Sequence, residues 1–243
     1  MGNSIETKRR IIKTADEDLV RQLDYQIEEN KKSLTLTCDK WPVYGSLIES
    51  YEDDFRPVLG SVSISSFVRR RSAPVVIDLM SPSDTLADLF MKFPNKPKLG
   101  IAHSYRDRRD KEKLDRDEKL GIKQVSGDIL ELETWNEIEE TLDGKKADLI
   151  IERAIKGKDF ITSDIRIHAV LLNKAWKLLS NDNGMLLAEV PHQRFDLLLR
   201  DKPITLFDWI SFVKKKGVNI DFNWHVLKLV KTSNSPQNLP FLK

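Results

Sequence analysis

The feature that most constrains this chain is a repeated alternation of strand-like and helix-like segments that begins at Ala73. Val75-Val76-Ile77 is a continuous β-branched run, which is typical of a strand buried on both faces. Segments with helical periodicity lie between this run and the later strand-like segments, and the periodicity is clearest over residues 164–179. Those later segments comprise residues 99–102, 122–126, 147–151 and 185–190. The alternation predicts an α/β fold with a doubly wound, mainly parallel sheet.

The end of the chain departs from this alternation. A helix is expected from about Thr205 to Lys216, with Gly217 after it. Apolar residues then alternate from Val218 to Trp224, and a second apolar run follows with almost no linker. Two strands joined so closely either pair antiparallel or form one long bent strand. We therefore expect an antiparallel strand at the C-terminal end of the sheet.

The first third of the chain has a different pattern. A capping box at Thr14 and Glu17 opens a segment with apolar residues at a spacing of four. These residues are Ala15, Leu19, Leu23 and Ile27. We predict a helical N-terminal extension or lid over residues 1–72 and a Rossmann-like domain over residues 73–243. Four aromatic residues of the extension either cover a small substrate or pack it on the sheet, and packing is the expectation: Trp41, Tyr44, Tyr51 and Phe55.

Composition and short sequence patterns bear on the partners, metal sites and compartment to be expected. Charged residues make up 32% of the chain, but the formal net charge is only +2, which neither requires nor excludes a nucleic-acid partner. Arg69, Arg70 and Arg71 form the one basic run considered for nucleic-acid phosphates, with a solvated charge run as the alternative. Cys38 is the single cysteine, and no metal site is expected. No apolar run has the length of a membrane span, so we expect a cytoplasmic protein without a membrane partner.

The first strand enters its helix through a turn that contains no glycine: Met80, Ser81, Pro82 and Ser83. Ser81 is predicted as the N-cap, with Pro82 at the first helical position and Asp84 at the third. A pyrophosphate is disfavoured here, because no glycine permits close approach and Asp84 already places negative charge at the helix N-terminus. NAD and FAD are therefore not expected, and no P-loop sequence occurs.

Four segments resemble the class I S-adenosylmethionine-dependent methyltransferases in their order and spacing, over about residues 73–231. They are Val76-Ile77-Asp78 in the first strand, Gly127-Asp128 after the third, Asp148 to Ala154 at the fourth, and Leu178 to Leu187 leading into the fifth. The resemblance implies a Rossmann-like fold, S-adenosylmethionine as cofactor and transferase activity. The chain departs from the family in its glycine-free turn and in lacking an acid at the end of the second strand.

The resemblance also implies a set of cofactor-binding residues. Asp78 would bind the amino group of the cofactor, and the backbone beyond Met80, at Ser81, would donate N–H groups to its carboxylate. Asp128 would bind the adenine amino group. The alternative for Asp78 is a turn or cap residue without a ligand, and for Asp128 an ordinary turn aspartate after glycine.

Three further candidates lie at two other strand ends. His103 stands near the position of the missing acid, with a structural histidine as the alternative. Glu152 and Arg153 follow the fourth strand, where substrate would meet cofactor, and the alternative is a mutual ion pair that closes the strand end.

The leading functional hypothesis is a methyltransferase with an unknown small-molecule or macromolecular acceptor. No catalytic residue is identified, because methyl transfer to a good nucleophile depends mostly on proximity and orientation. The alternative is a catalytically inactive methyltransferase-like scaffold that acts as a binding or assembly subunit.

Overall fold

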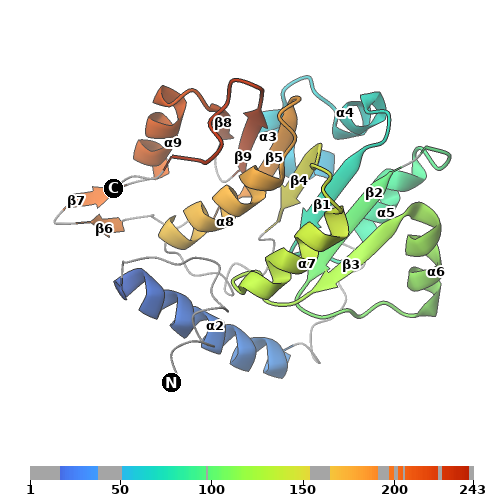
Figure 1. Cartoon of the computed structure of the whole chain (residues 1–243), viewed down its shortest axis with the longest axis horizontal. Helices are drawn as coiled ribbons and strands as arrows, with labels where there is room; N and C mark the ends of the chain where they lie inside the picture. The colour runs from blue at the N-terminus through green and yellow to red at the C-terminus, as the bar shows by residue number, and fades with distance from the viewer. Residues whose placement is uncertain are drawn as a thin grey trace.

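A seven-stranded sheet forms the centre of the protein, in the order β3-β2-β1-β4-β5-β9-β8 (Figure 1). The computed structural model describes residues 17–37, 51–96, 98–153, 165–190, 197–199, 202–204, 206–223 and 226–240. The first five strands run parallel to one another. They are β1 (Val75–Leu79), β2 (Leu99–Ser104), β3 (Ile122–Ser126), β4 (Leu149–Glu152) and β5 (Gly184–Glu189). The prediction of a doubly wound, mainly parallel sheet is confirmed.

The C-terminal strands form an antiparallel hairpin. β8 (Asn219–Asn223) pairs with β9 (Val226–Lys231), and β9 pairs antiparallel with β5. Of the two arrangements that the sequence left open, the chain adopts the antiparallel pair. The expected helix before it is α9 (Leu206–Lys215). A separate two-stranded sheet joins β6 (Leu197–Leu199) to β7 (Lys202–Ile204).

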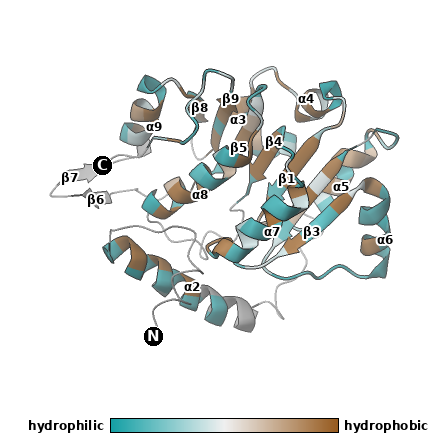
Figure 2. Ribbon diagram, in the orientation of Figure 1, coloured by the Kyte–Doolittle hydropathy of each residue, from teal (hydrophilic) through white to brown (hydrophobic). Residues whose placement is uncertain are grey.

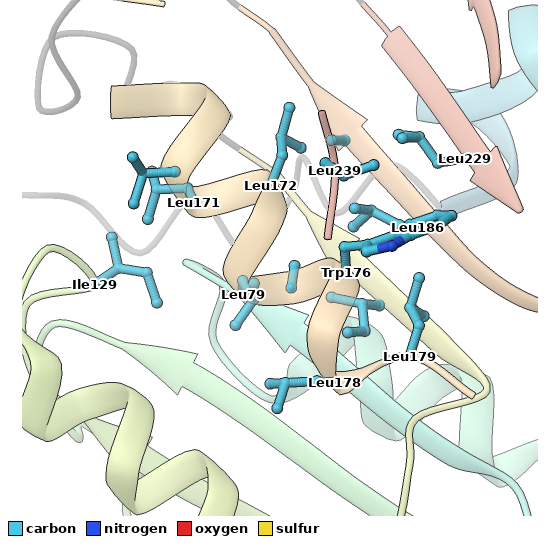
Figure 3. Packing of buried hydrophobic residues seen from close by; sticks show 14 of the residues in the cluster. Leu79, Ile129, Leu171, Leu172, Trp176, Leu178, Leu179, Leu186, Leu229 and Leu239 are labelled. Carbon is cyan, nitrogen blue, oxygen red and sulfur yellow. The ribbon is translucent and has the colours of Figure 1, made fainter. Parts of the chain in front are cut away.

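Helices cover both faces of the sheet, and each face has its own apolar cluster. Figure 1 shows α7 (Leu132–Leu142) and α8 (Ile165–Leu178) on one face, and α3 (Tyr51–Leu59) and α5 (Asp84–Met91) on the other. The first cluster contains the buried Trp135 and Trp176, and the second contains Phe55 and Phe90. In Figure 3, Trp176 and its neighbours on α8 lie against Leu186 of β5 and Leu229 of β9.

The pattern of hydropathy explains why these elements form a sheet between two helical layers. All five residues of β1 and all four of β4 are buried, and Figure 2 colours both strands as largely hydrophobic. The helices carry both hydrophobic and hydrophilic residues, as expected for elements that bury one face only. α6 (Lys111–Leu120) is the most polar example, with only Asp117 and Leu120 buried.

The N-terminal segments pack on the sheet through both clusters. α2 (Glu17–Thr37) places Leu19, Leu23 and Ile27 in the cluster of α8, while α3 and α4 (Ile64–Arg70) contribute to the other cluster. The packing role expected of Tyr51 and Phe55 is therefore observed. Thr14, Trp41 and Tyr44 lie outside the described residues. The proposed boundary at residue 72 stays a prediction.

The start of α5 differs from the expectation. The helix begins at Asp84 with Ser83 at the N-cap, so the assignment of Ser81 as N-cap is wrong. Met80 has a φ of 61°, a left-handed conformation that is uncommon outside glycine. This conformation extends the turn, and the Ser81 hydroxyl takes part in other contacts.

Candidate functional site

The candidate site lies where the carboxyl ends of β1 and β4 meet. The chain runs outward from β1 through β2 to β3 and then returns to β4 on the other side of β1. Ligands of doubly wound folds bind in the crevice at such a reversal of strand order. Asp78 of β1, His103 of β2 and Glu152 of β4 all lie near these strand ends.

Asp78 is a fully buried carboxylate. Its Oδ2 atom accepts a hydrogen bond from the Tyr51 hydroxyl at 2.6 Å and lies 3.3 Å from Nη2 of Arg153. Its Oδ1 atom has no hydrogen-bond partner among the described residues. Burial raises the pKa of Asp78, although the charge of Arg153 and the hydrogen bond from Tyr51 oppose that rise. The site thus holds a carboxylate that still has one oxygen to offer.

Arg153, the residue after β4, is 6% exposed and lies inside the group of side chains around Asp78. Its Nη2 atom donates to Ser81 Oγ at 2.6 Å and to Thr85 Oγ1 at 3.0 Å. Its Nη1 atom lies 3.3 Å from Asp54 Oδ2, and its Cζ atom lies 4.7 Å from the centre of the Tyr51 ring. We refer to the residues around this guanidinium as the cation box: Tyr51, Asp54, Asp78, Ser81 and Thr85.

The ion pair considered between Glu152 and Arg153 does not form, and Arg153 pairs with Asp78 and Asp54 instead. Successive residues along a strand point to opposite faces, which separates these two neighbours. Glu152 has its register partner in Leu79 of β1, on the face of α8. Asp78 and Arg153 belong to the opposite face, where α3 and α5 pack.

His103 supports the glycine-free turn. Its Nδ1 atom accepts from the Met80 N–H at 3.2 Å, so the ring proton is on Nε2, which donates to the carbonyl of Gly127 at 3.1 Å. The Ser81 N–H donates to the His103 carbonyl at 2.8 Å. Burial lowers the pKa of His103 to about 4, so the ring is neutral at neutral pH. The Ser81 N–H, which we expected to bind a ligand carboxylate, is already used inside the protein, as is the Met80 N–H.

Asp128 lies in the turn after β3. Its Oδ1 atom accepts from the Leu130 N–H at 2.9 Å, and its carbonyl accepts from the Thr134 hydroxyl at 2.7 Å. These contacts agree with the alternative of a turn aspartate and leave the adenine contact a prediction.

Glu152 is buried, and its Oε2 atom has no hydrogen-bond partner within the described part of the chain. Burial, together with the charge of Glu189 at the end of β5, raises the pKa of Glu152 to about 8. The side chain is therefore mostly a neutral carboxylic acid at neutral pH.

The basic run considered for nucleic acid lies before β1, at the amino end of the sheet. Arg71 forms ion pairs with Asp148 at 3.4 Å and with Asp182 at 3.0 Å, so its charge is used within the fold. Arg69 and Arg70 are exposed on α4. A nucleic-acid partner for these two residues stays a prediction.

None of the described helices combines the length and the apolar character needed to cross a membrane.

Comparison with known proteins gives similarity in structure only. No family model and no curated protein matches the chain. Solved structures that resemble it include NSun6 from Pyrococcus horikoshii with SFG, at 17% identity and a TM-score of 0.43, where the alignment covers 70% of this chain and 51% of NSun6. A TehB-like SAM-dependent methyltransferase from Corynebacterium glutamicum aligns at 11% identity and a TM-score of 0.40, over 86% and 98% of the two chains. The plantazolicin methyltransferase BamL aligns at 12% identity and a TM-score of 0.47, over 89% and 99%.

Because these identities and TM-scores are low, the assignment of the fold rests on the strand order of the chain itself. The deciding observation is that β9 runs antiparallel between β5 and β8 at the end of an otherwise parallel sheet. The chain has a methyltransferase-like α/β fold. Asp78 and His103 lie near the carboxyl ends of β1 and β2, and Asp128 follows the carboxyl end of β3.

The sequence missed the most connected residues of the site. The sequence indicates a packing or lid role for Tyr51 and no role for Asp54 or Thr85. Tyr51 is 27 residues from Asp78, and Asp54 is 99 residues from Arg153. No local pattern links such distant positions. The only signal was the position of Arg153 directly after a predicted strand.

Proposed function

We propose that the chain is an S-adenosylmethionine-dependent methyltransferase whose cofactor binds at the carboxyl ends of β1 to β4. The observation that carries this proposal is Asp78, a fully buried carboxylate at the reversal of strand order. Its Oδ1 atom lacks a hydrogen-bond partner within the described residues, although buried polar atoms are nearly always paired. A ligand that supplies a charged donor would complete this group.

The residues present fit the cofactor in their chemistry. The ammonium of its amino-acid end is a cation with three N–H donors, and Asp78 Oδ1 is a charged acceptor in a buried place where such a bond is strong. S-Adenosylmethionine has no phosphate, so it does not need a glycine-rich cradle. Met80 takes the left-handed conformation that glycine would otherwise supply. The turn therefore keeps a sharp bend despite its side chains.

When bound, the cofactor supplies a methyl group on a sulfonium sulfur, which a nucleophile can attack in line. The chain would contribute mainly by holding the two reactants in this geometry. Asp78 would bind the ammonium, and His103 would hold the turn through its bonds to Met80 and Gly127. Glu152, with a pKa of about 8, can hold or take up a proton at Oε2 near neutral pH.

One observation favours the alternative of a scaffold without catalysis. Arg153 already lies against Asp78 Oδ2, and the turn N–H groups are bonded to His103. Groups that the chain itself already pairs in this way need no ligand. The two functions are separated by whether the cofactor binds.

The test is calorimetric titration of the full chain with S-adenosylmethionine and with S-adenosylhomocysteine. We expect both to bind and Asp78→Asn to weaken binding by about ten- to a hundredfold, because a hydrogen bond to a charged group contributes roughly 1.5–3 kcal/mol. Asp115→Asn, on the exposed face of α6, is the matched control and should bind as the wild type does. A folded chain that binds neither compound would overturn the methyltransferase proposal and leave the scaffold.

A further inference from the structure

The cation box suits an organic cation. It presents two carboxylates, from Asp54 and Asp78, two hydroxyl oxygens, from Ser81 and Thr85, and the face of the Tyr51 ring. Carboxylates and hydroxyls accept N–H bonds, and an aromatic face attracts positive charge. In the described structure this cation is the guanidinium of Arg153.

We propose that Arg153 is an internal cation that competes with the cofactor for Asp78, so that cofactor binding requires the guanidinium to leave the cation box. The competition with the cofactor rests on the proposed function. The ability of the cation box to bind a cation rests only on the contacts above.

The charges of the box favour a cation. The side chains of Asp54 and Asp78 are 3% and 0% exposed, so both carboxylates are withdrawn from water. Buried charges without an opposite charge are costly, and such groups either neutralise or acquire a counter-ion. Arg153 supplies this charge from within the chain. Without it, the box would favour any cation of suitable size and donor geometry.

The position of Arg153 allows the exchange. β4 ends at Glu152, and the backbone of Arg153 is held beside β1 by its N–H, which donates to the Leu79 carbonyl at 3.4 Å. Its side chain is long and rotates about its own torsions, which lets the guanidinium leave while β4 stays paired. An ammonium at Asp78 Oδ1 would supply this carboxylate with the positive charge that Arg153 now provides at Oδ2. Two cations beside one fully buried carboxylate would repel each other strongly, so we expect the guanidinium to leave when the ammonium binds.

Competition of this kind lowers the apparent affinity for the cofactor. If the box is filled by Arg153 in nine molecules of ten, the apparent dissociation constant rises about tenfold over its intrinsic value. A variant without the guanidinium should therefore bind the cofactor more tightly. A residue that helps to hold the cofactor would give the opposite change.

The first experiment tests the box without the cofactor. Thermal unfolding of Arg153→Ala is measured at increasing methylguanidinium, with the same series in sodium chloride as the ionic-strength control. We expect a saturable rise in the melting temperature of Arg153→Ala with methylguanidinium and no such rise in the wild type. The double variant Arg153→Ala, Asp78→Asn should lose this rise. Equal responses in wild type and Arg153→Ala would overturn the assignment of the box as a cation site.

The second experiment measures S-adenosylhomocysteine binding by calorimetry in the wild type, Arg153→Ala and Arg153→Lys. We expect roughly tenfold or tighter binding by Arg153→Ala and an intermediate value for Arg153→Lys, because lysine keeps the charge but lacks the planar fork of donors. If Arg153→Ala does not fold without methylguanidinium, Arg153→Lys decides the point.

The outcomes separate the two proposals. Binding by the wild type that is unchanged or weaker in both variants would overturn the competition and leave the proposed function in place. Absence of binding by all three folded proteins would overturn the proposed function and with it the competition, while the methylguanidinium experiment would still decide the nature of the box.

Discussion

At the scale of single residues, Glu152 makes the stability of the fold depend on pH. Its pKa rises from the ordinary 4.5 to about 8 in the folded chain, so between these values the folded state holds a proton that the unfolded state has released. Stability therefore falls as pH rises through this window, by up to about 1.4 kcal/mol per pH unit. We expect Glu152→Gln to remove this loss and to be more stable than the wild type above about pH 8.

The measurement is urea unfolding of both proteins at several pH values across the window. The quantity to follow is the difference in unfolding free energy between variant and wild type. His103 is present in both proteins, and because its pKa is lowered from 6.5 to about 4, it makes stability rise with pH over that range. A difference in unfolding free energy that does not change with pH would contradict the assignment of a buried, proton-holding Glu152.

At the scale of elements, α5 and α6 are joined by ion pairs across their surfaces. Asp84, in the first turn of α5, accepts from Lys113 and from Arg116 of α6, each at 2.8 Å. Arg116 also pairs with the buried Asp117 at 2.7 Å. The contacts with Asp84 connect α6 to a neighbouring helix. Burial works against the charge of Asp84, but the hydrogen bonds from Lys113 and Arg116 lower its pKa overall.

Asp84→Asn should therefore weaken the attachment of α6. We expect a loss of about 1 kcal/mol in unfolding free energy at low salt, because the carboxylate is partly exposed and solvent screens its ion pairs. The loss should shrink as salt increases, since screening weakens the wild-type pairs. Urea unfolding at low and high salt measures both effects, with Asp115→Asn as the control on the exposed face of α6. A loss that is independent of salt would point to packing and away from charge.

At the scale of the whole molecule, the order of strands and helices followed from periodicity, whereas the site did not. The patterns that predict β1 and β9 lie in residues that are adjacent in the sequence. The run Val75-Val76-Ile77 forms part of β1, and the apolar run that begins at Val226 forms β9 of the hairpin, as expected. The predicted start of α5 was wrong because the turn before the helix depends on the left-handed conformation of Met80. A methionine side chain gives no indication of that backbone conformation. The partners of Arg153 depend on how α3 packs against the sheet, and only the folded chain brings them together.

Because Tyr51 and Asp54 belong to α3, the motions of that helix are tied to the state of the site. Releasing the guanidinium of Arg153 removes its contact with Asp54 and its cation–π contact with the Tyr51 ring, so local opening of α3 becomes easier. Hydrogen–deuterium exchange should therefore be faster in residues 51–59 of Arg153→Ala than in the wild type, and unchanged in α6, which is attached through Asp84. Equal acceleration in both helices would mean that the substitution loosens the whole fold. Acceleration confined to α3 would give the amino-terminal part of the chain a means to sense, through its own fluctuations, which cation lies beside Asp78.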